Sequence, residues 1–272
     1  MFRLASSPEV VTSLASGRLA SDSHFPPGVG EFFPPALFGL EGWLTKFTIL
    51  AWVAVGLLII FFLSAYRKPT LVPSRTQWMA ESVYGFARDQ IAVPMLGHEG
   101  VRFAPYFATL FSFILLTNLF GIIPFIQISP NSHIAFPIIL SVISYVMFNY
   151  IGIRKHGFGK YIKHQIMPNA PWFILPLLIP IEIFSTFIVR PVTLALRLFA
   201  NMFAGHMILL VFTLGGFALL NATAWYIKPI SIVSWAMAIA LTFLEALVIL
   251  LQAYVFVVLT SSYISGAVAE EH

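Results

Sequence analysis

Five ionisable side chains stand within two long apolar stretches of the sequence, near residues 171–220 and 229–264. They are Glu182, Arg190, Arg197, His206 and Glu245, and the amides of Asn201 and Gln252 lie among them. A charge at the centre of a bilayer costs at least about 2.5–3.5 kcal/mol, so ionisable residues in spanning helices usually face protein or water and serve a function. These residues are therefore the first candidates for chemistry.

The residue types divide this chemistry into two roles. Arginine has a pKa above about 12 and effectively never releases its proton, so Arg197 can hold a permanent positive charge but cannot relay protons. His206 and Glu245 can both titrate, histidine near neutrality and glutamate when it is buried. A fixed cation beside separate titratable groups is what a gated proton path requires.

Helical spacing predicts which of these side chains share a face. At about 100° per residue, Arg197 and Asn201 lie about 40° apart, and Glu245 and Gln252 about 20° apart. Each helix therefore presents one polar stripe, and the two stripes can face each other. His206 lies about 180° from Arg197, so we expect these two side chains to face different environments.

Simpler interpretations remain open for some of these residues. Arg190 and Glu182 lie near a helix end and Pro191, so both side chains could extend to the membrane interface. Asn201 and Gln252 could serve only to hold helices together by hydrogen bonds.

The composition predicts the elements that must position these groups. The chain has 272 residues, of which 59% are hydrophobic and only 10% charged, far below the roughly 25% charged residues of soluble domains. The sequence predicts an all-α membrane protein with about five transmembrane helices, because its uncharged stretches are long enough to cross a bilayer. The predicted spans are 47–66, 104–127, 134–153, 171–220 and 229–264. Pro176, Pro180 and Pro191 interrupt the fourth span, and Gly215-Gly216 and residues 221–229 separate it from the fifth.

The remaining segments differ from the spans in composition. Residues 1–40 are polar and rich in proline and glycine, and we interpret them as a loosely ordered tail without a signal peptide, followed by a single membrane bundle over 41–272. Residues 73–99 mix charged and apolar side chains at helical spacing. This pattern predicts an amphipathic helix at the membrane interface, although a solvated loop helix fits it equally well.

The basic residues orient the chain. They gather in the segments 67–102 and 154–163, whereas the segment 128–133 has no Lys or Arg and 221–228 has only Lys228. The positive-inside rule therefore places both basic segments in the cytoplasm, the N-terminus outside and the C-terminus inside. The net charge of +4 reflects this asymmetry, and we expect no nucleic-acid partner.

Three sequence motifs resemble the a subunit of F-type ATP synthases. The first is PVTLALRLFANMFAGH at residues 191–206, the second is LEAL at 244–247 with LQAYVF at 251–256, and the third is NLFGIIP at 118–124. The resemblance covers about residues 100–265, and residues 1–40 show none that we can use. In this family, two long tilted C-terminal helices lie against a rotating ring of c subunits, and two offset half-channels pass protons to and from ring carboxylates.

The resemblance implies a role for each candidate residue. Arg197 matches the essential arginine that separates the half-channels, and Asn201 and Gln252 match the polar residues near it. His206 and Glu245 match a titratable pair that the family uses in either order. Glu182 matches an acidic position of the other half-channel. Gly121 stands where some relatives have an acid, so we assign no proton role to that stretch.

The resemblance also implies partners and a location. We expect a non-catalytic, proton-translocating subunit with no catalytic residues, no cofactor and no metal site. Its partners would be the c-subunit ring, the b subunit of the peripheral stalk, the remaining ATP synthase subunits, protons and the lipid membrane. We expect a bacterial plasma membrane, with an organelle energy-transducing membrane as the alternative, and the choice between proton and sodium depends mostly on the ring.

Two other functions compete with this one. A self-contained transporter or channel would need an internal repeat or polar residues in several helices, whereas here the polar residues cluster in the last two. A structural scaffold leaves Glu182, Arg197 and Glu245 unexplained within apolar helices.

Overall fold

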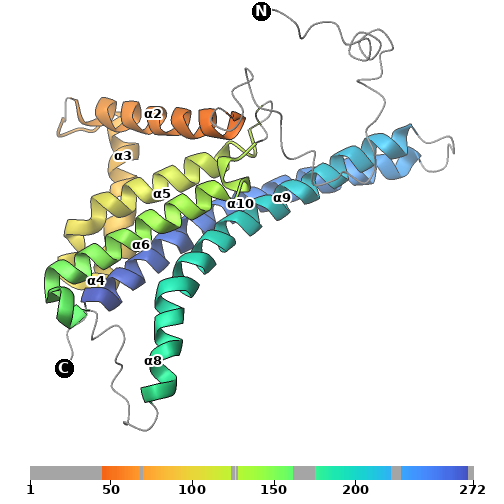
Figure 1. The fold of residues 1–272 in the computed structure, drawn as a ribbon. Coiled ribbons are helices and arrows are strands. Elements are labelled where there is room, and N and C mark those ends of the chain that lie inside the picture. The colour runs from red at the N-terminus through yellow and green to blue at the C-terminus, as the bar shows by residue number, and fades with distance from the viewer. Residues whose placement is uncertain are drawn as a thin grey trace, which may run out of the picture. The chain divides into compact units, whose positions relative to one another are not determined.

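The computed structural model describes residues 45–67, 70–123, 126, 128–161, 175–221 and 228–268. These residues form helices and turns with no strand, which confirms the predicted all-α fold (Figure 1). The described residues contain five helical segments long and apolar enough to cross a membrane, and they span Lys46–Tyr66, Arg75–Leu119, Ala135–His156, Leu177–Leu220 and Lys228–Val268. The tail over 1–40 and the C-terminal residues 269–272 lie outside the described residues.

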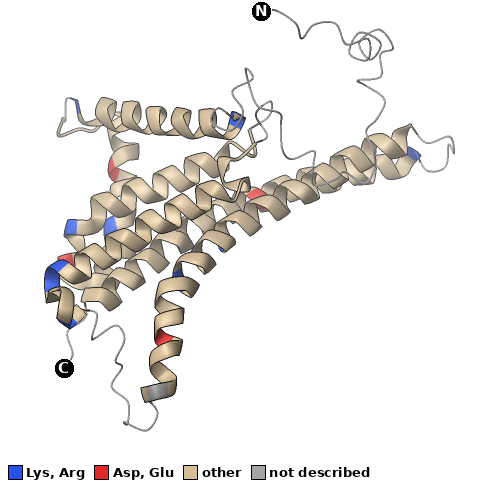
Figure 2. Cartoon of the chain, in the orientation of Figure 1, with Lys and Arg blue, Asp and Glu red and all other residues tan. Residues whose placement is uncertain are grey.

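The first helix, α2 (Lys46–Tyr66), begins where the side chain of Thr45 accepts a hydrogen bond from the Thr48 amide at 3.4 Å. It carries no charged residue after Lys46, and large apolar side chains such as Trp52 and Leu63 are exposed along it. An apolar helix with apolar side chains on its outer surface is the form that lipid requires. Figure 2 shows the same pattern more widely, with charged residues few and long uncharged helical stretches between them.

A nearly continuous helical run follows, from α3 (Arg75–Phe86) through the π-helical η4 (Ala87–Ala92), α4 (Val93–Leu96) and the 3-10 helix η5 (Gly97–Phe103) to α5 (Ala104–Leu119). The predicted helix over 73–99 thus has helical structure, and its position at the membrane interface stays a prediction.

Helix α5 ends at Leu119, before the predicted end of that span at 127. The amide of Gly121 bonds to the Asn118 carbonyl and that of Ile122 to the Leu119 carbonyl, each at 3.0 Å, so the chain tightens into turns that close the helix. The short 3-10 helix η6 (Pro130–Ser132) then leads to α6 (Ala135–His156). Gly157 ends α6 with a φ of 79°, a conformation that glycine adopts without strain.

The two long C-terminal helices are α8–α9 and α10. Helix α8 (Leu175–Phe184) continues through the π-helical η7 (Ser185–Val189) into α9 (Arg190–Leu220), and α10 covers Lys228–Val268. Pro191 has no amide hydrogen and its ring pushes the preceding turn away, so a widened π turn directly before it is expected. Figure 1 shows the helix bending between α8 and α9. The helix therefore bends before Pro191, and the prolines do not divide it within the described residues.

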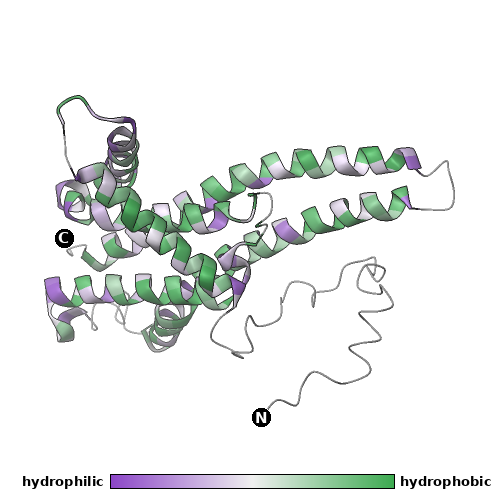
Figure 3. Cartoon of the chain, turned by 90° about the horizontal axis from the view of Figure 1, so that it is seen from above, coloured by the Kyte–Doolittle hydropathy of each residue, from purple (hydrophilic) through white to green (hydrophobic). Residues whose placement is uncertain are grey.

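The chain forms two compact units, and α9 and α10 contribute to both. The described parts of the smaller unit are 207–221 and 228–242, where α9 and α10 run as an antiparallel pair (Figure 3). The Ser234 hydroxyl donates to the Phe212 carbonyl at 2.7 Å, and Gly216 lies so close to Trp235 that a Cβ would come within 2.3 Å of the indole Nε1. The expected separation at Gly215-Gly216 is wrong for this reason: Gly216 lies inside α9 and allows the two helices to approach closely.

The larger unit holds the main core, where α5, α6, α9 and α10 pack together. Its largest fully buried side chains include Phe107, Phe148, Leu198 and Phe256, one from each of these helices. Because lipid is as apolar as these residues, the helices associate through close packing and buried hydrogen bonds more than through exclusion of water. This packing fixes α9 against α10 where the candidate site residues lie.

Candidate functional site

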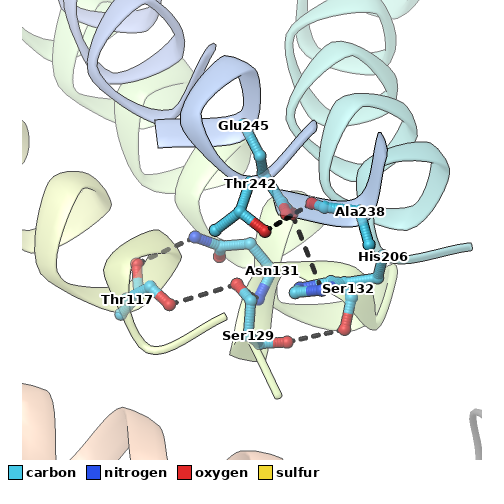
Figure 4. A network of polar contacts seen from close by, with 8 residues as sticks. All are labelled: Thr117, Ser129, Asn131, Ser132, His206, Ala238, Thr242 and Glu245. Carbon is cyan, nitrogen blue, oxygen red and sulfur yellow. Dashed lines mark hydrogen bonds and ion pairs between the residues drawn. The ribbon is translucent and has the colours of Figure 1, made fainter. Parts of the chain in front are cut away.

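A buried pair formed by His206 of α9 and Glu245 of α10 is the centre of the site (Figure 4). Nδ1 of His206 lies 3.6 Å from Oε1 of Glu245, and the side chains are only 7% and 4% exposed. Gly205 makes room for the carboxylate, because a Cβ at this position would come within 2.9 Å of the same Oε1. This separation is slightly longer than a hydrogen bond, so the carboxyl and the imidazole can exchange a proton through one water molecule or after a small closing movement.

A cluster of small polar side chains lies beside this pair. Figure 4 shows Thr117 at the end of α5 and Ser129, Asn131 and Ser132 on the segment before α6, and the His206 ring lies close to Gly121 directly after α5. Asn131 Nδ2 donates to Thr117 Oγ1 at 2.8 Å and to Asn118 Oδ1 at 2.6 Å, and the Ser129 hydroxyl donates to the Thr117 carbonyl at 3.1 Å. Every member of this cluster is buried: Thr117, Asn118, Ser129, Asn131 and Ser132.

Not every polar atom of the cluster is satisfied by protein. Among the described residues, Asn118 Nδ2, Asn131 Oδ1 and both carboxylate oxygens of Glu245 have no hydrogen-bond partner. Buried polar groups are nearly always hydrogen-bonded to protein or to ordered water. The amides of Asn118 and Asn131 and the Glu245 carboxylate are therefore the atoms at which ordered water would be expected to bind.

Sequence reasoning did not identify this cluster. Asn118 is within a motif of the resemblance, yet we assigned no proton role there because Gly121 replaces an acid. The structure gives Gly121 another purpose, since a Cβ at this position would come within 2.4 Å of the His206 ring. The local sequence pattern does not predict the hydrogen bond between Asn131 and Thr117, because the two residues are 14 positions apart in the sequence.

Asn201 and Gln252 face each other between α9 and α10. Asn201 Nδ2 donates to Gln252 Oε1 at 2.6 Å, and Gln252 is buried. This hydrogen bond confirms that the polar stripes of the two helices meet, as their spacing predicts. It also fits the simpler interpretation of helix-to-helix bonding, so a role in proton transfer stays a prediction.

Arg197 lies one turn before Asn201, and its side chain is exposed, whereas His206 is buried. This difference agrees with the predicted half-turn between them. Among the described residues, no carboxylate lies within ion-pair distance of the Arg197 guanidinium. The exposed face around it carries small and polar residues, and one large apolar residue, Leu196. The small and polar ones are Thr193, Ala200, Asn201 and Ala204.

Glu182 and Arg190 form a second, separate polar group on the bent helix. Arg190 Nη2 lies 3.6 Å from Glu182 Oε1, and the Thr186 hydroxyl donates to the same oxygen at 3.5 Å. The Arg190 guanidinium also lies 5.6 Å from the centroid of the Tyr263 ring of α10. The two charged side chains are therefore paired with each other, and about 36 Å of helix separates Glu182 from His206.

The close contact at Gly121 yields a direct prediction. If the chain conducts protons as the motif resemblance implies, a Gly121→Ala substitution should displace the His206 ring and lower that conductance several-fold, because the added methyl group overlaps that ring. Gly56→Ala in α2 is the matched control, since nothing lies within 4 Å of a Cβ there. The measurement is the proton conductance of membrane vesicles containing equal amounts of assembled complex. Equal conductance in the two variants would show that the position of His206 is unimportant.

Fold and site together define a polytopic α-helical membrane protein with ionisable side chains inside its longest spanning helices. Comparison with known families then gives the particular one: the model of the ATP synthase A chain family matches residues 48–265. The chain belongs to this family, which confirms the resemblance seen in the motifs. The match begins well before residue 100, so the resemblance is longer than those motifs indicate.

Curated relatives agree with this assignment. A protein named ATP synthase subunit a from a Nocardioides species is 46% identical over 265 residues, covering 92% of this chain and 95% of its own length. A protein of the same name from Rhodococcus erythropolis is 41% identical and covers 96% of both chains, and one from Streptomyces lividans is 38% identical over 90% of this chain and 88% of its own. The Rhodococcus alignment covers part of residues 1–40, whereas the family model begins at residue 48.

Proposed function

We propose that this chain is the stator a subunit of the proton channel of an ATP synthase. It provides two half-channels that pass protons to and from the carboxylates of a rotating c-ring, and so couples proton flow to ATP synthesis. The observation that carries the proposal is Arg197, an exposed arginine in a membrane-spanning helix with no carboxylate partner among the described residues.

A permanent charge in this position needs a partner that the described part of the chain does not provide. Arginine cannot become neutral by losing its proton, and placing it among lipid tails costs at least about 2.5–3.5 kcal/mol. The neighbouring Ala200 and Ala204 leave space for another helix to approach α9 closely, as small residues do at membrane helix interfaces. A ring of helices that brings one carboxylate after another to Arg197 supplies the missing negative charge. It also supplies the helix that can pack closely against Ala200 and Ala204.

The two polar groups on either side of Arg197 fit the two half-channels. His206, Glu245 and the polar cluster on the α5–α6 segment form one group, and Glu182 with Arg190 forms the other. Arg197 lies between them along the helix and cannot relay protons. A proton would therefore have to leave one group on a ring carboxylate and reach the other only after the ring has turned.

The energetics favour a rotary assembly over a channel that acts alone. One charge crossing 100 mV releases about 2.3 kcal/mol, so the protons of several crossings must be combined to drive ATP synthesis. The remaining ATP synthase subunits, including the b subunit of the peripheral stalk, are the partners that this function requires. The bacterial relatives favour the plasma membrane, and the basic segments favour a cytoplasmic C-terminus and an external N-terminus.

Disulfide cross-linking tests the ring-facing surface, and the absence of cysteine from the native sequence makes it practical. Ala200→Cys lies on the exposed face of α9 that carries Arg197, and it should cross-link under oxidation to a cysteine placed one turn from the ring carboxylate. The cross-link should block ATP-driven pumping until a reductant is added. Val142→Cys, which is exposed on α6, is the matched control and should not cross-link. Equal cross-linking of both variants, or of neither, would refute the assignment of this surface.

A further inference from the structure

A cavity of about 770 Å³ lies away from the site, where η5 and the start of α5 meet the last turns of α6 and the end of α10. Its volume is within the range of sites that hold small ligands, about 300–1,000 Å³. No residue of the proposed proton path lines it. Its walls instead combine a basic end with an apolar side.

The basic end is formed by Arg102 of η5 and by Arg154 and Lys155 of the last turn of α6. Lys155 Nζ lies 3.3 Å from Glu99 Oε2, so part of its charge is compensated. Among the described residues, neither arginine has a carboxylate within ion-pair distance. The cavity therefore carries a net positive charge at this end, and it suits a phosphate group.

The apolar side follows α6 toward the membrane interior. Ile151 lies one turn before Lys155, and Met147 is two turns before Arg154, which corresponds to about 10 Å along the helix axis. Phe103 and Val268 complete this wall from η5 and α10. Tyr150, which is 56% exposed, stands between the two regions, where an aromatic side chain with a polar tip is typical of the membrane interface.

We propose that this cavity binds an anionic phospholipid, with the phosphate against Arg102 and Arg154 and the upper acyl chain along Met147 and Ile151. A free phosphate or nucleotide would use only the basic end and leave the apolar wall in water. A zwitterionic phospholipid carries the same phosphate, but its ammonium group brings a second positive charge to the basic end, so an anionic headgroup fits better. Basic pockets between spanning helices at the cytoplasmic surface are the usual sites of anionic headgroups, and the positive-inside orientation places this cavity there.

Lipid retention by the purified whole complex tests the proposal. The detergent-solubilised complex is exchanged into mixtures of phosphatidylglycerol and phosphatidylcholine, repurified, and its bound lipid quantified by mass spectrometry. Wild type should retain phosphatidylglycerol preferentially. The double variant Arg102→Gln/Arg154→Gln should lower this retention by about tenfold or more, because two cation–phosphate contacts are lost. Met147→Gln should also reduce it, because the acyl chain loses part of its wall.

Matched controls separate this site from general surface charge. Arg75→Gln/Arg88→Gln removes the same charge from α3 and η4, outside the cavity, and should retain lipid like wild type. Equal loss in both double variants, or equal retention of the two lipids by wild type, would overturn the proposal. Displacement of the lipid by inorganic phosphate at matched concentration would also overturn it and would identify a soluble-anion site. If a variant fails to assemble, the comparison of phosphatidylglycerol with phosphatidylcholine retention by the wild-type complex still tests the proposal.

Discussion

Replacing Arg197 by alanine should abolish ATP-driven proton pumping in inverted membrane vesicles while the complex remains assembled. Without the guanidinium, nothing on the exposed face of α9 attracts the deprotonated ring carboxylate or repels a passing proton. Passive proton conductance through the membrane part should therefore persist or rise, while coupled pumping is lost. Quenching of a pH-sensitive dye on addition of ATP measures the pumping, and its dissipation after removal of the soluble catalytic part measures the leak.

Arg88→Ala is the control for the loss of an arginine. The Arg88 side chain is half-exposed and lies 3.6 Å from Asp89, outside the two C-terminal helices, so its removal should leave pumping close to wild type. Normal coupled pumping in the Arg197→Ala complex would mean that this arginine is structural. The separation of two half-channels would then need another explanation.

Exchange of the buried pair should show that proton transfer needs one acid and one imidazole, in either order. Glu245→Gln should lower proton conductance by about tenfold or more, which corresponds to about 1.4 kcal/mol in the barrier, because the amide cannot titrate. His206→Glu alone places two carboxylates together, and like charges at this distance oppose ionisation. The double variant His206→Glu/Glu245→His restores one group of each kind at the position of the native 3.6 Å contact and should conduct better than either single variant.

The conductance of all four complexes is compared at equal assembly. A double variant no better than the weaker single variant would show that the site requires one acid at one fixed position. Wild-type conductance in Glu245→Gln would exclude the carboxyl from the path altogether.

Much of this architecture is predictable from the sequence because membrane helices obey simple rules. The uncharged stretches indicate the helices, and the 3.6-residue period places Arg197 and Asn201 on one face and His206 on the opposite one. The hydrogen bond between Asn201 and Gln252 follows from the same arithmetic. These inferences succeed because both long helices stay regular across the residues concerned.

Other features depend on tertiary contact and leave little trace in the local pattern. The ion pair between Glu182 and Arg190 forms across a π turn, whose wider spacing no regular helix predicts. In the sequence, Gly216 resembles a residue that ends a helix. In the structure it lies inside α9, where the absence of a side chain makes room for the Trp235 ring. The buried amides of Asn118 and Asn131 come together only because the segment after α5 folds back. In each case a packing partner distant in sequence decides the outcome.

The most direct test of the central proposal is whether water reaches the two polar groups from opposite sides of the membrane. Ser132→Cys lies in the polar cluster next to His206 and Glu245, and Thr186→Cys lies beside Glu182, each a small change in a chain without native cysteine. Ile59→Cys on the apolar surface of α2 is the control. We predict that a membrane-impermeant thiol reagent labels the cysteine at 132 only from outside, the one at 186 only from the cytoplasm, and the one at 59 from neither side. Labelling of 132 and 186 from the same side, or of neither, would contradict two half-channels separated by Arg197.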